Sequence, residues 1–292
     1  MKVLKYFLCM WLAVLMQVFV SCSEDDPIDK EQGTEQGGSK DDETEGEEDN
    51  DKEDEVIEES IYQPYVTDKR VSELVVKQIQ DFKDGTRDIN YRYYQFTYDK
   101  EGRISKELYY SQFDGKEPSD TIVTKFTYSG NMIYLQYNHI TGGFTSDYDI
   151  TLNPRGYVSG QDYDEDGYLV GYFVSGYKDG NCRVRWKNGN LVSESKPVDS
   201  YSCTYTDYLN DTSLDLTSFL IRSAQMRGNI DIPCDTEGKR SVNLPKVRKI
   251  THSTKDIQRN FIYKFDSQKR VIEITITGSN YESVVYYLTY EE

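Results

Sequence analysis

The chain has 292 residues and a net charge of −17, with 51 acidic residues against 34 Lys and Arg, 26 tyrosines and five cysteines. The acidity is concentrated near the N-terminus, because residues 23–60 hold 19 Asp and Glu against three Lys. Such a segment repels phosphate, and the rest of the chain has no basic stripe, so the composition excludes nucleic acid as a partner.

The first 21 residues have the layout of a secretory signal peptide. Lys2 and Lys5 form a short positive region, and residues 7–20 are apolar apart from Gln17. This apolar run is shorter than the roughly 20 residues that a membrane-spanning helix needs. The layout predicts export of the chain and removal of residues 1–21.

The signal ends in "FVSC", residues 19–22, which resembles a bacterial lipobox, with Phe19 where an aliphatic residue is more usual. The resemblance implies that Cys22 becomes the lipidated N-terminus and that its acyl chains attach the protein to a membrane. Ordinary cleavage, which would leave Cys22 as a free thiol, is the alternative.

An acidic segment follows the cysteine. Its first four residues resemble the export signal that Bacteroidota surface lipoproteins carry beyond the lipidated cysteine; they are Ser23, Glu24, Asp25 and Asp26. The resemblance implies display on the outer face of the outer membrane, although any acidic linker would begin in the same way. Residues 22–60 bury too little apolar surface to fold, so we expect a lipidated, disordered tether.

Residues 61–292 have the composition of a single all-β domain. They are rich in Tyr, Thr, Val and Ile, which favour pleated, half-buried surfaces. Residues 90–99, "NYRYYQFTYD", alternate so that Arg92, Tyr94 and Phe96 share one face. We expect an antiparallel meander of successive hairpins that forms a large open or barrel-like sheet. Residues 213–223 break the alternation and predict a short helical plug, with Ser213 as its N-cap.

One unit recurs along the domain: an aromatic residue or Leu, three polar residues, Gly, a variable residue and an aliphatic residue. It occurs as "YDKEGRI" at 98–104, "LNPRGYV" at 152–158 and "YDEDGYL" at 163–169. This frame predicts hairpins, because Gly takes the left-handed conformation of the turn without a Cβ penalty. Residues 188–189, Asn-Gly, predict a two-residue version. Residues 265–271 are a degenerate copy, and Lys269 in the glycine position requires either strain or a different turn.

These copies resemble the YD repeat, Tyr-Asp-x-x-Gly-Arg-(Leu/Ile), which residues 98–104 match in full. With the lipobox, the acidic tether and "SLDLTSFL" at 213–220, they make the chain similar to a Bacteroidota lipoprotein family of unknown function with a porin-like β-fold. The resemblance covers most of residues 61–292. It implies a run of antiparallel hairpins and brings no catalytic residues.

The most acidic turn contains the start of a calcium-loop pattern. Asp162, Asp164 and Asp166 lie at positions 1, 3 and 5 of an EF-hand loop, with Gly167 at position 6. Position 12 is Phe173, which cannot ligate a cation, and sister turns carry Lys100 and Glu101, or Pro154 and Arg155, at the equivalent positions, so the turn forms without metal ligands. We therefore expect a structural turn and no metal or other cofactor, with a weak calcium site as the alternative.

Three cysteines remain in the domain, Cys182, Cys203 and Cys234. This odd number allows at most one intramolecular bridge, so the domain is not a disulfide scaffold. No Cys-x-x-Cys pair occurs, and neither histidine lies near a cysteine in the sequence, so the spacing does not favour zinc. The pattern indicates buried single thiols.

No reaction-specific motif is present, and we predict that the protein is not an enzyme. The nucleophile elbow and the phosphate-binding loop are both missing, and only His139 and His252 can supply an imidazole base. The alternative is a hydrolase that uses carboxylates on β-turns, since the separation of two carboxylates is a three-dimensional property.

The tyrosines favour a binding role, because exposed aromatic rings stack on sugars or pack on proteins. Trp186, beside its Asn-Gly turn, is the first candidate for such a ring. A membrane pore is disfavoured, since "GRISKELYYSQ" at 102–112 places charge on both faces of its strand. We therefore expect a surface-exposed outer-membrane lipoprotein with a binding or envelope-accessory role, whose ligand is a glycan or a protein.

Overall fold

The computed structural model describes residues 58–292, except 178, 222–233, 253–254 and 279–281. The chain divides into a unit of residues 1–54 and a unit of residues 55–292, and only the second is described below. The expected signal peptide, Cys22 and the expected export signal at Ser23, Glu24, Asp25 and Asp26 all lie outside the described residues.

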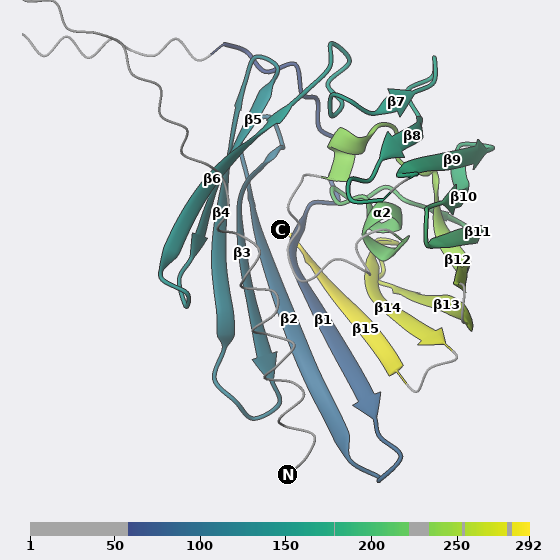
Figure 1. Cartoon of the computed structure of the whole chain (residues 1–292). Helices are drawn as coiled ribbons and strands as arrows, with labels where there is room; N and C mark the ends of the chain where they lie inside the picture. Colours follow the sequence, from purple (N-terminus) through teal and green to yellow (C-terminus); the bar gives the residue numbers. More distant parts are fainter. Residues whose placement is uncertain (1–57, 178, 222–233, 253–254, 279–281) are drawn as a thin grey trace, which may run out of the picture. The chain divides into compact units, whose positions relative to one another are not determined.

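The described unit consists almost entirely of strands (Figure 1). The strands are β1 (Val71–Asp81), β2 (Arg87–Tyr98), β3 (Ile104–Phe113), β4 (Ser119–Ser129), β5 (Met132–His139), β6 (Phe144–Thr151), β7 (Asp162–Tyr163), β8 (Leu169–Phe173), β9 (Asn181–Lys187), β10 (Asn190–Ser195), β11 (Asp199–Leu209), β12 (Asn243–His252), β13 (Lys255–Phe265), β14 (Val271–Gly278) and β15 (Glu282–Tyr290). One short α-helix, α2 (Leu216–Ile221), and a 3-10 helix, η2 (Cys234–Glu237), lie between β11 and β12. Among the described residues, no helix has the length and apolar character needed to cross a membrane.

All fifteen strands belong to one antiparallel sheet, as the sequence predicts. Its order is β6-β5-β4-β3-β2-β1-β15-β14-β13-β12-β11-β10-β9-β8-β7, so strands that follow one another in sequence are neighbours in the sheet, apart from β6 and β7, which are its two edges. In addition, β1 pairs with β15, which joins the first and last strands of the meander (Figure 1). The sheet is not closed, because its order ends at β6 on one side and β7 on the other.

Alternation of buried and exposed side chains follows the predicted period of two. In β2, Tyr94 and Phe96 are buried while Gln95 and Thr97 are exposed, which confirms the face assigned from the sequence. In β4 the buried positions again fall at every second residue, from Ile122 to Tyr128. These strands therefore present one mostly apolar face, and burial of a large apolar side chain contributes about 1.5–3 kcal/mol to stability.

The predicted plug is helix α2, which lies within residues 213–223 and has five buried residues out of six. Phe219 makes edge-to-face contacts with Tyr94 of β2, at a centroid distance of 6.1 Å, and with Tyr286 of β15, at 5.8 Å. Leu220 and Leu216 are buried in the same apolar cluster as these strands. The helix therefore fills the core beside the strands that join the two ends of the meander.

The predicted N-cap of this helix is wrong. Asp215, not Ser213, caps it, since the Asp215 carboxylate accepts a hydrogen bond from the backbone N–H of Ser218 at 3.1 Å. Ser213 has a different partner: its hydroxyl oxygen accepts the N–H of Val71 at 2.9 Å and lies 2.8 Å from the Tyr98 hydroxyl. This serine therefore fixes the start of β1, and the helix begins two residues later.

Candidate functional site

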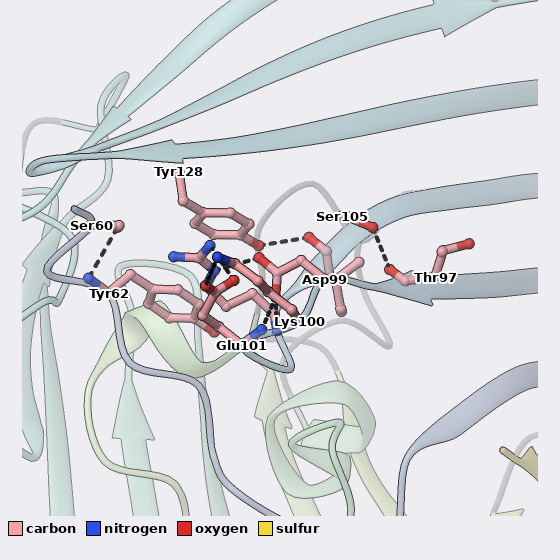
Figure 2. A network of polar contacts seen from close by, with 10 residues as sticks. Ser60, Tyr62, Thr97, Asp99, Lys100, Glu101, Ser105 and Tyr128 are labelled. Carbon is pink, nitrogen blue, oxygen red and sulfur yellow. Dashed lines mark hydrogen bonds and ion pairs between the residues drawn. The ribbon is translucent and has the colours of Figure 1, made fainter. Parts of the chain in front are cut away.

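The turn between β2 and β3 shows how the recurring unit is held (Figure 2). One carboxylate oxygen of Asp99 accepts the backbone N–H groups of Glu101, at 3.0 Å, and Arg103, at 2.9 Å. The other accepts Nε of Arg103 at 2.6 Å. Gly102 has φ of 83°, the left-handed conformation predicted from the sequence. The aspartate is therefore a structural acceptor that closes the turn.

The same bonds recur in the other copies. Asn153 accepts the N–H of Tyr157 at 3.2 Å, Asp164 accepts that of Tyr168 at 2.8 Å, and Asp266 accepts that of Arg270 at 2.9 Å. The degenerate copy keeps the turn, because Lys269 adopts φ of 59° in the glycine position. Strain, rather than a different turn, is therefore the outcome for this lysine.

An aromatic donor locks each hairpin to the next strand. The Tyr128 hydroxyl donates to the carbonyl of Ile104 at 2.8 Å, and the Tyr290 hydroxyl donates to Val271 at 2.8 Å. Equivalent bonds run from Tyr98 to Val71, from Tyr163 to Val158, from Trp186 to Leu169 and from Tyr205 to Leu191. Burial raises the pKa of Tyr290, so its hydroxyl remains a donor at physiological pH. We call these six bonds the aromatic locks.

Trp186, the first candidate for a binding ring, is one of these locks. Its indole N–H donates to the Leu169 carbonyl at 2.7 Å, and its ring packs on Tyr168 at a centroid distance of 4.7 Å. The side chain is partly buried by these contacts. The structure thus places the Trp186 ring against the ring of Tyr168.

The residue after the turn glycine, or after Lys269, separates the copies into two kinds; we call it the slot residue. In two copies the slot is an arginine. Arg103 and Arg270 each form an ion pair with the turn aspartate, at 2.6 and 2.7 Å, and lie over an aromatic-lock ring, Tyr128 or Tyr290. The Tyr128 ring also stacks on Tyr62, at a centroid distance of 5.3 Å (Figure 2). In both turns the slot arginine is therefore engaged within its own hairpin.

The other two copies carry tyrosine in the slot, Tyr157 and Tyr168. Their turns lie side by side, because Arg155 donates to the carbonyls of Asp164, at 2.7 Å, and Glu165, at 3.1 Å. Both tyrosine rings line the same groove. We call it the tyrosine groove; it has a volume of about 440 Å³ and is completed by residues 63–65, 209–211 and 238–242.

The wall of the tyrosine groove formed by residues 238–242 approaches the turn closely. The N–H of Lys239 donates to the carbonyl of Gly167 at 2.8 Å, and a Cβ on Gly238, which has φ of 97°, would lie 2.8 Å from that same oxygen. Only glycine permits this approach. It places the Lys239 ammonium 5.4 Å from the centre of the Tyr168 ring.

Tyr65 forms the opposite wall and is 42% exposed. The Arg240 guanidinium lies 4.0 Å from the centre of its ring and also donates to the carbonyl of Thr212 at 2.6 Å. Asp211, the carboxylate of the groove, forms an ion pair with Lys69 at 2.6 Å. Within the described residues, Lys239 has no acidic partner, so the groove combines three tyrosine rings with one available ammonium.

The acidic turn does not gather its carboxylates. Asp164 holds the backbone of its own turn, and Asp162 lies in strand β7, paired with Gly171 of β8. Asp166 occupies a variable position of the turn. In the part of the chain that the structure describes, no group of three or more His, Cys, Asp or Glu side chains is placed to hold a metal ion. Asp164 therefore has the same structural role as the turn acceptor in the other copies.

Cys182 and Cys203 are buried free thiols, as the sequence predicts. Burial raises the pKa of the Cys203 thiol to about 12 and also raises that of Cys182, so both stay protonated and unreactive. The side chain of Cys234 lies outside the described part of the chain. His139 and His252 lie on different strands, β5 and β12, and His139 stacks on Phe144 at 4.9 Å.

Sequence reasoning did not identify the tyrosine groove. Tyr65, Lys239 and Arg240 come from segments with no motif, and no sequence signal marks them. Tyr157 and Tyr168 do have a signal, since an alignment of the four turns shows tyrosine where two copies carry arginine.

Comparison with known proteins finds similarity among solved structures. No protein-family model matches the chain, and no curated protein matches it. Among solved structures, a crystal structure of a porin-like protein from Bacteroides uniformis is similar, with a TM-score of 0.55 and 14% sequence identity. The match covers 78% of this chain and 99% of that one. At this identity the likeness concerns the fold alone: the chain shares the β-fold of a porin-like Bacteroides uniformis protein.

Proposed function

We propose that the protein is a surface-exposed outer-membrane lipoprotein with a non-catalytic binding role, and that its ligand, a glycan or a protein, occupies the tyrosine groove. The fold shared with a porin-like bacterial protein is compatible with an envelope role. The lipobox-like end of the signal, with Cys22 as the lipidated residue, and the acidic residues after it support attachment and display.

The tyrosine groove is the observation that carries the binding role. Tyrosine offers an apolar ring face and a polar hydroxyl, which suits the apolar face and the hydroxyl groups of a sugar. Tyr65 already has a guanidinium against its ring, and 42% of its surface is still exposed. Lys239 adds a hydrogen-bond donor and a positive charge beside Tyr168. These are the residue types that fix the orientation of a ligand in a mostly apolar groove.

The alternative, a hydrolase that uses turn carboxylates, is less well supported. Glycoside hydrolysis needs two carboxyl groups about 5–10 Å apart that are free to act on the substrate. Asp99, Asp164 and Asp266 instead accept hydrogen bonds from the backbone of their own turns. Asp211, in the groove, is engaged by Lys69.

A glycan array probed with the purified chain tests the binding role. We expect Tyr65→Ala to reduce binding about tenfold, the equivalent of one good contact. Tyr134→Ala is the matched control, because Tyr134 is 43% exposed on β5, outside the groove, and its loss should leave binding unchanged. Equal losses in the two variants, or release of a hydrolysed product from the bound glycan, would refute the proposal.

Surface display has a separate test. Replacement of Glu24, Asp25 and Asp26 by Ala should leave the protein protected from added protease in intact cells, because the acidic export signal is then lost. Continued cleavage at the surface would contradict this part of the proposal, with the unmodified chain as the reference for full exposure.

A further inference from the structure

A second concave surface lies on strands β9–β11, on residues that the tyrosine groove does not use. It has a volume of about 710 Å³, and its floor and walls are polar. Serine supplies most of the floor, at Ser193, Ser195, Ser200 and Ser202, and arginine supplies one wall, at Arg183 and Arg185. We call this surface the serine trough.

The register of the sheet explains this arrangement. Ser193 lies opposite both Arg185 of β9 and Ser202 of β11, and Ser202 in turn lies opposite Lys249 of β12. Residues directly opposite in neighbouring strands share a face. This row therefore runs from an arginine across two serines to a lysine, over about 14 Å at the usual strand spacing.

A second row runs parallel to the first. Ser195 lies opposite Arg183 of β9 and Ser200 of β11, and Ser200 lies opposite Thr251 of β12. The short hydroxyl side chains thus form the floor between longer side chains. Each hydroxyl group can both donate and accept a hydrogen bond.

The cations of the serine trough have no internal partner. Arg183 and Arg185 line the trough, and Lys249 lies beside it on β12. All three are exposed, and within the described residues none of their side chains forms a hydrogen bond or an ion pair. The arginines of the repeated turns differ, since Arg103 and Arg270 are both ion-paired to aspartate. The guanidinium groups of the trough remain free to form bidentate hydrogen bonds with an oxyanion.

Several carboxylates lie near the serine trough, but within the described residues none forms an ion pair with its cations. Glu194 is among the lining residues but is buried, and its carboxylate accepts the hydroxyls of Tyr172 and Tyr201, each at 2.6 Å, and pairs with Lys196 at 3.0 Å. Asp179, at the end of the trough, accepts the amide of Asn181 at 3.2 Å. Asp162 and Asp256 lie at the two ends of the second row, beyond Gly171 and Thr251. The cations of the exposed face are therefore unpaired but flanked by carboxylates.

We propose that the serine trough binds a polysaccharide that carries sulfate or carboxylate groups. The guanidinium groups of β9 and the ammonium of Lys249 would bind the oxyanions, and the hydroxyl floor would form hydrogen bonds with the sugar hydroxyls between them. Both oxyanions present the same chemistry to arginine, and the test separates them. This inference does not rest on the tyrosine groove, so either site can fail alone.

The test measures binding of the full-length chain to immobilised dextran sulfate, polygalacturonate and uncharged dextran. We expect binding to one or both charged polymers and none to dextran, with weaker binding at higher salt, because exposed charges are screened. Binding to dextran sulfate alone assigns sulfate, and binding to polygalacturonate alone assigns carboxylate. Failure to bind either polymer, or equal binding to poly-glutamate, would overturn the proposal.

Variants show whether the serine trough itself is responsible. Arg183→Gln with Arg185→Gln should weaken binding about tenfold. The control, Lys106→Gln with Lys125→Gln, removes the same charge from an exposed opposed pair on β3 and β4 and should change binding less than about twofold. Ser202→Asp keeps every cation but adds a carboxylate to the floor, and should weaken binding as well. Equal losses of binding in the arginine variant and its control would show that binding depends only on the net charge of the chain, and would refute the site.

Discussion

Two regions of the sheet share the same turn, but its slot residue makes different contacts in each. At the β2–β3 and β13–β14 turns, the slot arginine pairs with the turn aspartate and covers an aromatic ring. At the turns of Tyr157 and Tyr168, a tyrosine occupies the slot and its ring lines a groove. The backbone bonds are alike in all four copies, so the turns differ in the slot side chain, which pairs with its own turn as arginine and lines the groove as tyrosine.

The largest effect should come from the acceptor that both kinds of turn share. Asp99→Ala removes the acceptor for two backbone N–H groups and the partner of Arg103, so we expect a loss of about 2 kcal/mol in the free energy of unfolding. Asp99→Asn is the matched control and should cost less, because Asn153 holds an equivalent turn. Chemical denaturation measures both variants, and equal losses would show that the ion pair, not the backbone acceptor, holds the turn.

Smaller losses should follow from breaking one aromatic lock. Tyr128→Phe keeps the ring that contacts Arg103 and Tyr62 but removes the hydroxyl that donates to Ile104, and should cost about 1 kcal/mol. Tyr134→Phe, on an exposed ring of β5, serves as the control and should have no measurable effect. Equal melting temperatures for the two variants would show that the hydrogen bond from Tyr128 to Ile104 does not stabilise the fold.

Trp186 distinguishes support of the tyrosine groove from direct contact with a ligand. Trp186→Phe removes the hydrogen bond to the Leu169 carbonyl, with a cost of about 1 kcal/mol, but keeps an aromatic ring behind Tyr168. Ligand binding should therefore change much less than in Tyr65→Ala. A loss of binding with unchanged stability would show instead that Trp186 itself contacts the ligand.

The smallest effect concerns pH. The backbone N–H of Arg270, with the Arg270 side chain and the N–H of Gln268, lowers the pKa of Asp266. A carboxylate with a lowered folded pKa contributes stability that is full above its unfolded pKa, about 3.9, and is lost as the pH falls through the folded pKa. The difference in melting temperature between the unmodified chain and Asp266→Asn should therefore shrink below about pH 4. A constant difference down to pH 2 would contradict this.

Much of the fold could be predicted from the sequence, because its determinants are local. Period-two alternation placed Tyr94 and Phe96 on one face of β2, and the glycine positions identified the turns, including Gly102. The helix was predicted at the right place, but its cap was not. Ser213 and Asp215 are both good caps, and the choice depends on Val71, which lies 142 residues from Ser213 and takes its hydroxyl.

The candidate sites could not be predicted in the same way, because they depend on long-range pairing. Tyr65 and Arg240 are 175 residues apart in sequence, yet their side chains are in contact. The serine trough depends on register, since a shift of one residue in β10 would turn Ser193 and Ser195 to the other face. No periodicity in a single strand contains that information.

The most direct measurement of the central claim is ligand binding after an exchange of slot residues. Tyr157→Arg with Tyr168→Arg should abolish glycan-array binding, since both turns would then close on themselves as the turn of Arg103 does. Arg103→Tyr with Arg270→Tyr should leave binding intact, because those turns lie outside the tyrosine groove. Equal binding by both exchange variants would contradict the account.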